Sequence, residues 1–184
     1  MRKTLYLKFL LAYLIFGIFG FIFVATFVSS MTKEHLITVQ SEKLYETATV
    51  VANTYAVDLY NNNTALDTVK NQLDALDQYL KAEVWIINPS GRLILSSRNP
   101  IDIDKEIMIE GFDPTVYGGD NYAEGRFFNY FEEDHLSVFS PITADFKVKG
   151  YVVIHYPMSE IEQELNSLLI IDYMMLLILF ILSM

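Results

Sequence analysis

The sequence predicts an α+β domain held between two membrane-spanning helices. Three observations lead to this prediction. Residues 9–28 are uncharged and apolar, residues 168–184 form a second apolar run, and the stretch between them is acidic. Within that stretch, two helical patterns precede several short runs of β-forming residues. We therefore expect a long N-terminal helix and a second helix packed on a roughly five-stranded antiparallel sheet.

Composition limits the class of protein. At 184 residues the chain holds one modest domain plus accessory segments. A net charge of −10 argues against nucleic acid as a partner. The mean hydropathy is nevertheless positive, at +0.27, which fits an acidic domain combined with very apolar segments. The absence of cysteine excludes a disulfide framework and a thiolate metal site.

The first apolar run is long enough to cross a membrane. Phe9–Val28 contains twenty uncharged residues, and a span needs about 20. Arg2, Lys3 and Lys8 precede it, so residues 1–8 are expected in the cytoplasm. The alternative is a cleavable signal peptide, whose apolar region is about 7–15 residues long and ends in small residues. Because Phe27 stands where a small residue is needed, we expect an uncleaved anchor.

Residues 29–167 are expected to form an extracytoplasmic domain. They carry 10 Lys or Arg and 22 Asp or Glu, a charge of −12. Residues 29–60 lack Gly and Pro and should continue the first helix outward. Ile37, Leu44 and Val51 recur every seven residues, each followed four positions later by Ser41, Ala48 or Tyr55. This stripe indicates either a dimer seam or packing on the domain's own sheet, and both alternatives stay open.

A second helix and the first strands follow. Asn61–Asn63 predicts a turn, with Thr64 as N-cap of an amphipathic helix that reaches about Lys81. Residues 83–87 and 92–97 read as two strands joined by the turn Asn88-Pro89-Ser90-Gly91. Residues 98–125 are expected to be an irregular excursion. Strands are then predicted at 127–131, 136–141 and 150–156, with a polar turn at 144–149.

The last strand leads through Pro157 into an acidic helical segment and then into the second apolar run, which is expected to be a membrane helix cut off at Met184. Asp172 has two interpretations. If the membrane begins at Leu168, this carboxylate lies inside it and has a functional role. If the membrane begins at Tyr173, Asp172 is interfacial. The second interpretation is preferred here. Pro157 and Asp172 are the expected signal-transmission residues.

The excursion and its neighbours supply the candidate ligand-binding residues. An anionic ligand would use the guanidinium groups, and the aromatic rings would wall a pocket. The alternative is that the rings are sheet core and the arginines are surface charges. The candidates are Arg98, Tyr122, Arg126, Tyr130 and His135, with Tyr117 and Asp120 as further members of the segment.

Two acidic runs have the oxygen chemistry that hard cations prefer, although a solvated acidic face has the same composition. They are Asp102, Asp104, Glu106 and Glu110, and then Glu132, Glu133 and Asp134. No enzyme signature is present in the sequence. Because His35, His135 and His155 are far apart in sequence, no transition-metal site is expected, and no cofactor.

The order of these parts resembles the sensor region of bacterial membrane histidine kinases with a single extracytoplasmic Cache (PAS-like) domain. The matching segments are VWIINPSGRLILSS and HLSVFSPITADFKVKGYVVIHYPMSEIEQEL, together with the long helix that leaves the membrane. The resemblance implies a homodimer and a small ligand bound between the sheet and the excursion. It also implies a cytoplasmic kinase beyond Met184, which would act on a response regulator.

We therefore expect a multi-pass receptor of the bacterial plasma membrane that transmits the binding of a small molecule or divalent cation through its second membrane helix. A chemoreceptor or a nucleotide cyclase could carry the same sensor. Two other classes are a membrane-anchored extracellular enzyme, with an acid pair such as Glu132 and Asp134, and a structural or adhesive dimer without a ligand.

Overall fold

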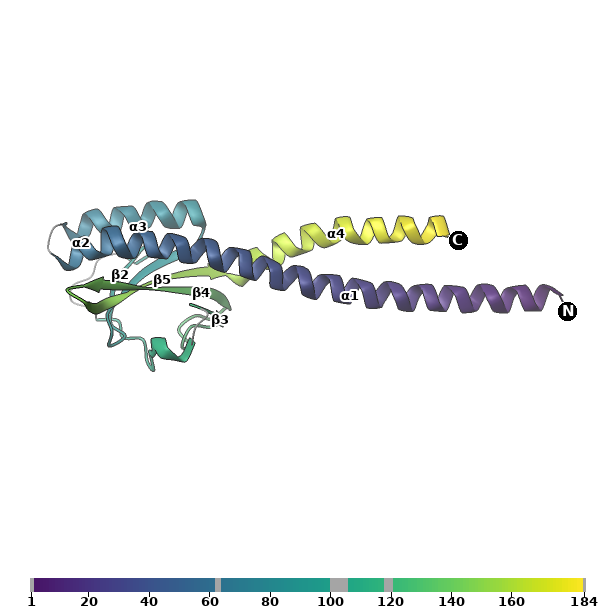
Figure 1. The fold of residues 1–184 in the computed structure, drawn as a ribbon, viewed down its shortest axis with the longest axis horizontal. Helices are drawn as coiled ribbons and strands as arrows, with labels where there is room; N and C mark the ends of the chain where they lie inside the picture. The colour runs from purple at the N-terminus through teal and green to yellow at the C-terminus, as the bar shows by residue number, and fades with distance from the viewer. Residues whose placement is uncertain (1, 62–63, 100–105, 118–120, 184) are drawn as a thin grey trace. The chain divides into compact units, whose positions relative to one another are not determined.

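A computed structural model describes residues 2–61, 64–99, 106–117 and 121–183 of the chain (Figure 1). The chain divides into two compact units. One unit is the domain Ile37–Glu160, and the other is a helical pair made of Met1–Leu36 and Ile161–Met184.

The helices before the sheet follow the predicted pattern. Helix α1 spans Arg2–Val51 and is followed by a π-helical turn, η1, at Ala52–Ala56 and by α2 at Val57–Tyr60. Helix α3 spans Leu66–Leu80 and buries its apolar stripe, including Val69 and Leu73. Its N-cap residue is Ala65 rather than the predicted Thr64, and no side chain caps the helix there. Lys81 ends it in the left-handed conformation.

The sheet has five antiparallel strands in the order β2-β1-β5-β4-β3. The strands are β1 (Glu83–Ile87), β2 (Leu93–Ser96), β3 (Tyr122–Gly125), β4 (His135–Ala144) and β5 (Lys147–Pro157). A short 3₁₀ helix, η2, lies at Pro114–Tyr117. The predicted α+β class, with helices on a five-stranded antiparallel sheet, is confirmed.

Two details of the predicted sheet are wrong. Residues 127–130 form a turn instead of the strand expected at 127–131, and the fifth strand is β3, inside the segment expected to be irregular. Phe127, Phe128 and Asn129 all have positive φ, which a β-strand excludes. The predicted polar turn at 144–149 contracts to Asp145 and Phe146, at φ 52° and 58°. A two-residue turn of this kind lets β4 and β5 pair almost to its edge.

The two faces of the sheet pack against different partners. Ser140 on β4 lies 3.2 Å from the Thr49 hydroxyl of α1, so its face is the one covered by helices. The α1 stripe is buried on this side within a single chain, which supports packing on the domain's own sheet for this part of the seam. Its buried members are Ile37, Ser41, Leu44, Ala48 and Val51. The opposite face, which we call the loop face, carries Trp85, Phe139 and Val153 under the segments that contain Ile109 and Phe127.

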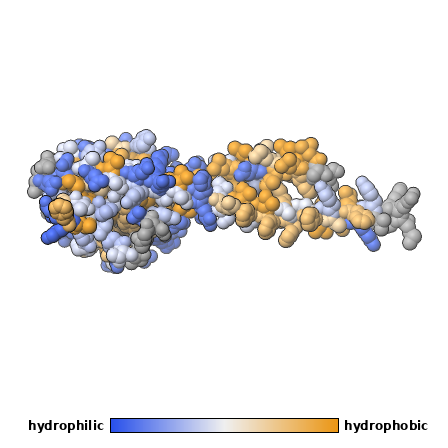
Figure 2. All heavy atoms as spheres, viewed as in Figure 1, coloured by the Kyte–Doolittle hydropathy of each residue, from blue (hydrophilic) through white to orange (hydrophobic). Residues whose placement is uncertain are grey.

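The helical pair contains α4, which spans Met158–Ser183, beside the N-terminal part of α1. Both helices are long and apolar enough to cross a membrane, by length and composition. Apolar side chains cover this pair in Figure 2, whereas the domain surface is largely hydrophilic. Tyr13 stacks on Phe180 at 6.5 Å between ring centroids, and Phe21 meets Tyr173 at 6.3 Å, so the two helices run antiparallel.

This pairing bears on Asp172. The neighbouring ring of Tyr173 lies level with Phe21, which is well inside the apolar run Phe9–Val28. If that run is the span, then Asp172 lies inside the membrane rather than at its surface. This placement agrees with the first of the two interpretations given by the sequence, in which Asp172 lies within the membrane, and a role for its carboxylate in signal transmission stays a prediction.

Gly150 is expected to be intolerant of a side chain. A Cβ at this position would lie 2.6 Å from the Ile87 carbonyl oxygen and 2.8 Å from the Tyr60 hydroxyl. We expect Gly150→Ala to lower the free energy of unfolding by about 1–3 kcal/mol, measured by urea denaturation of fragment 30–167.

The Tyr60 hydroxyl is buried without a hydrogen-bond partner among the described residues. Tyr60→Phe should therefore be close to neutral alone and should restore part of the loss in the double variant, because it removes one of the two clashes. A Gly150→Ala variant as stable as the wild type would contradict this account.

Candidate functional site

The loop face gathers six aromatic and imidazole rings from β1, β4, β5 and the turn after β3. Strand register accounts for three of them. Trp85 pairs with Val153, and Ser137 with His155, so the alternating side chains of β1, β4 and β5 share one face. The turn that follows Gly125 supplies the others. The cluster, called here the aromatic cage, consists of Trp85, Phe127, Tyr130, Phe131, His135 and His155.

The turn that enters the cage is conformationally strained. Phe127, Phe128 and Asn129 have φ values of 38°, 51° and 59°, a region that costs a residue with a bulky side chain about 1–2 kcal/mol. The Tyr130 amide donates to the Phe127 carbonyl at 3.0 Å, which closes the turn. Ring contacts offset the strain, because Trp85 meets Tyr130 at 4.8 Å and Phe127 at 5.8 Å.

His155 lies at the centre of the cage and is fully buried. Its ring centroid is 4.4 Å from those of Trp85 and Phe127. Nδ1 is 2.8 Å from the Ser137 hydroxyl, while Nε2 is buried without a partner among the residues that the structure describes. Desolvation holds the pKa of His155 well below its ordinary value, and electrostatic interactions with His135 and Arg98 lower it further. The imidazole is therefore neutral at neutral pH and offers one nitrogen for a hydrogen bond.

A buried carboxylate borders the cage. Glu83 Oε1 accepts hydrogen bonds from Trp85 Nε1 at 2.6 Å and from the Ser96 hydroxyl at 2.8 Å. The Ser96 oxygen in turn accepts the backbone amide of Arg98 at 3.1 Å. Burial raises the pKa of Tyr130, and the negative charge of Glu83 raises it further. Through Ser96, Glu83 thus connects the indole of Trp85 to Arg98, at the start of the segment that covers the loop face.

The described residues of the cage lack the geometry of a nucleophilic catalytic site. Ser137 and His155 form the pair that a hydroxyl nucleophile would need. Ser137 is only 1% exposed, however, and no third group orients His155 through Nε2 among the described residues. The described residues also include no group of three or more His, Asp or Glu arranged to hold a metal. The alternative acid pair, Glu132 and Asp134, is solvent-exposed.

The structure brings together only some of the residues singled out from the sequence. Tyr130 and His135 belong to the cage, and His135 Nδ1 lies 2.9 Å from the Glu133 carbonyl oxygen. Arg98 is near enough to influence His155, but its guanidinium is held by Asp77, at 3.0 Å from Nε to Oδ2 and 3.2 Å from Nη2 to Oδ1. The Asp77 hydrogen bond, opposed in part by burial, raises the pKa of Arg98.

The other candidates lie elsewhere. Tyr122 is in register with Val138, on the helix-covered face of the sheet. Arg126 is exposed, with Nε 3.9 Å from Asp134 Oδ1. Glu106 pairs with Arg92 at an exposed position, and Glu110, Glu132 and Glu133 are exposed. Asp102, Asp104, Asp120 and the side chain of Tyr117 lie outside the described residues.

Sequence reasoning missed Glu83, Phe127, Phe131 and His155 as members of one site. Strand alternation contained part of the signal, because Glu83 and Trp85 share a face, as do Val153 and His155. It did not show that the histidines of β4 and β5 approach to 6.4 Å between ring centroids. That proximity depends on the pairing register of two strands.

Comparison with solved structures identifies the fold. The sensor domain of the Vibrio cholerae histidine kinase DctB aligns at a TM-score of 0.53 and 15% identity, over 74% of this chain and 56% of that one. A domain of a sensory box/GGDEF family protein from Vibrio parahaemolyticus aligns at 0.61 and 13%, over 82% and 65%. The extracellular domain of the histidine kinase vpHK1S-Z8 aligns at 0.53 and 11%, over 74% and 57%.

These likenesses define the class of fold. The chain shares the fold of extracytoplasmic sensor domains, in agreement with the Cache-like, PAS-like architecture predicted from the sequence. It covers less than two thirds of each of these three chains. At the level of sequence, no family model and no curated protein matches it.

The stability of the domain should fall below pH 6.5 because of His155. The unfolded chain binds a proton at the ordinary histidine pKa of 6.5, whereas the folded chain resists protonation to a much lower pH. The unfolded state therefore holds more protons in this window, and stability is lost as the pH falls through it, by up to about 1.4 kcal/mol per pH unit.

Urea denaturation of fragment 30–167 between pH 7.5 and 5 measures this slope. His155→Phe should flatten it, while the exposed His35→Gln should leave it unchanged. An equal slope in wild type and His155→Phe would show that His155 does not control it.

Proposed function

We propose that this chain is the sensing part of a bacterial transmembrane receptor. Its domain binds an external small molecule, or alternatively a divalent cation, at the loop face and passes the event to the membrane through α4. Arg2, Lys3 and Lys8 before the first apolar run support a cytoplasmic N-terminus, with residues 29–167 outside the cell. A homodimer in the plasma membrane, a histidine kinase output and a response regulator complete the proposal.

One observation carries the proposal: the cage is directly connected to the start of α4. His135 of the cage pairs in register with Pro157, the last residue of β5. The next residue, Met158, begins α4, and its amide donates to the Asp134 carbonyl at 3.1 Å. A displacement of the segment before β4 would therefore pull on the first turn of α4 through a backbone hydrogen bond.

A further contact ties the first turn of α4 to the domain. Glu160 lies 3.4 Å from Lys81, the residue that ends α3. Because this pair is exposed, it contributes little stability and is easily rearranged. This ion pair would oppose a rearrangement of the helix start only weakly, as a two-state element that a ligand biases requires.

The cage itself supports small-molecule binding. It combines packed aromatic rings with one imidazole nitrogen that has no partner among the described residues, and the strained turn at Phe127–Asn129 packs against it. A ligand that hydrogen-bonds His155 Nε2 and displaces this turn would release the strain. Binding energy and the conformational change would then be coupled in one step.

A ligand screen on fragment 30–167 tests the binding step. Carboxylic acids, amino acids, sugars, Mg²⁺ and Ca²⁺ would be tested for a raised melting temperature and for a change in the fluorescence of Trp85, the single tryptophan. We expect at least one compound to change both signals, and His155→Phe to abolish the response.

Arg126→Gln is the matched control, because Arg126 is exposed and outside the cage. If Arg126→Gln rather than His155→Phe abolished the response, the binding site would lie at the exposed arginine and not in the cage. A silent screen would favour a mechanical or protein input, or the structural-dimer alternative.

A chimaera tests transmission. The chain would be fused after Met184 to a histidine-kinase output module and reconstituted in membranes, and autophosphorylation would be measured with and without a ligand found in the screen. We expect the ligand to change the rate severalfold, and Asp172→Leu to reduce that change without altering binding, because it removes a carboxylate from the helical pair.

Met175→Leu, at another position on α4, should behave as wild type. Full signalling by Asp172→Leu would exclude a role for this carboxylate in transmission. The same fusion would be made with a chemoreceptor or a cyclase module. A response to the ligand from one of these modules, and none from the kinase module, would favour that alternative class of receptor.

A further inference from the structure

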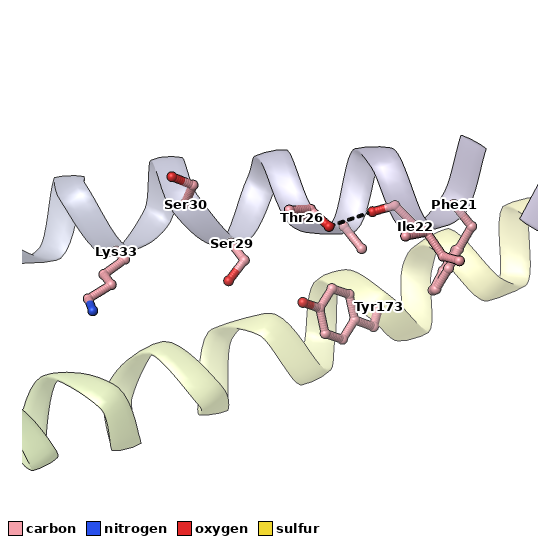
Figure 3. A pocket seen from close by; sticks show the side chains of 8 residues that line it. Phe21, Ile22, Thr26, Ser29, Ser30, Lys33 and Tyr173 are labelled. Carbon is pink, nitrogen blue, oxygen red and sulfur yellow. Dashed lines mark hydrogen bonds between the residues drawn. The ribbon is translucent and has the colours of Figure 1, made fainter. Parts of the chain in front are cut away.

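The helical pair contains a groove that the proposed sensing function does not use. It has a volume of about 550 Å³ and lies between α1 and α4 (Figure 3). Tyr173 is its one lining residue from α4. The α1 residues that line it are Phe21, Ile22, Ala25, Thr26, Ser29, Ser30 and Lys33.

The lining residues change from apolar to polar along α1. Phe21, Ile22 and Ala25 form one end, hydroxyl side chains follow, and Lys33 stands at the other end. At 1.5 Å per residue, Phe21 and Lys33 are separated by about 18 Å along the helix. The groove therefore presents an apolar surface and a polar, cationic end about three helical turns apart.

The polar end carries side chains for which no hydrogen bond or ion pair is found in the part of the chain that the structure describes. Thr26 is satisfied within its helix, since its hydroxyl donates to the Ile22 carbonyl at 2.8 Å. In Figure 3 the side chains of Ser29 and Lys33 and the hydroxyl of Tyr173 point into the space between the two helices, whereas Ser30 points away. Lys33 takes part in none of the ion pairs found among the described residues.

An unpaired ammonium group beside hydroxyls, five residues beyond the end of an apolar run, has the chemistry that recognises a phosphate at the membrane surface. The apolar end of the same groove suits an acyl chain. We propose that this groove binds one anionic phospholipid, with its phosphate at Lys33 and Ser29 and an acyl chain along Phe21 and Ala25. The proposal concerns the helical pair alone and is independent of what the cage binds.

A second copy of the chain fits the groove less well. A seam between membrane helices is made of small or apolar residues along its length, because close backbone approach stabilises it. Here the groove ends in a lysine, which a packed helix would have to cover without an ion partner. The charge and the order of polarity therefore favour a lipid.

Native mass spectrometry of the full chain, Met1–Met184, tests the proposal. The protein would be purified in detergent with equal amounts of phosphatidylglycerol and phosphatidylcholine carrying the same acyl chains. We expect wild type to retain the anionic lipid severalfold over the zwitterionic one, and Lys33→Gln to bring this ratio close to one.

Two control variants separate the proposed lipid contact from a general loss of positive charge and from a disturbance caused by any substitution at position 33. Lys43→Gln removes an exposed lysine from the same helix outside the groove and should keep the wild-type ratio. Lys33→Arg keeps the charge and should do the same, which shows that position 33 tolerates substitution. A wild type without preference, or a Lys33→Gln variant with an unchanged ratio, would overturn the proposal.

Crosslinking separates the lipid from a second copy. Ser29→Cys would be oxidised in membranes, in a chain that otherwise has no cysteine. Little disulfide-linked dimer is expected if a lipid fills the groove. Efficient crosslinking, insensitive to added phosphatidylglycerol, would show that another copy's helix covers the groove and would also overturn the proposal.

Discussion

The pairing of β5 on both of its edges is the constraint on which the rest of the domain depends. This strand lies at the centre of the sheet, hydrogen-bonded to β1 on one side and β4 on the other, and residues 152–155 are buried. Its alternating side chains serve two cores at once, with Val152 and Ile154 toward the helices and Val153 and His155 toward the loops. Because both edges are paired, β5 cannot slip by one residue without exchanging the two cores.

This constraint explains how the aromatic cage and the start of α4 share one strand. The register that brings His155 beside Trp85 and Ser137 also brings Pro157 beside His135, at the point where α4 begins. The central strand β5 holds the imidazole of His155 in place. The segments that pack on it at the loop face are turns with few regular backbone hydrogen bonds. In the proposed sensing function, the strained turn at Phe127–Asn129 would be the part that moves and the sheet its fixed support.

Both units contain polar groups in apolar surroundings. In the domain, His155 and Glu83 are buried among aromatic rings; two hydrogen bonds reach Oε1 of Glu83, whereas Nε2 of His155 has no partner among the described residues. In the helical pair, the groove that ends at Lys33 and the carboxylate of Asp172 interrupt two otherwise apolar surfaces. Each such group is costly unless a partner compensates it, which is why these positions carry the functional proposals.

The sequence by itself determined the class of the fold, the helices, the two apolar segments and four of the five strands, because these depend on local periodicity and on Gly and Pro signals. It could not place β3 or the turn at Phe127–Asn129, since a run rich in aromatic residues satisfies a strand pattern and a strained turn equally well. The sequence could not predict the aromatic cage, for a physical reason. Glu83, Phe127, His135 and His155 meet only after long-range strand pairing sets their register, and that pairing belongs to the tertiary structure.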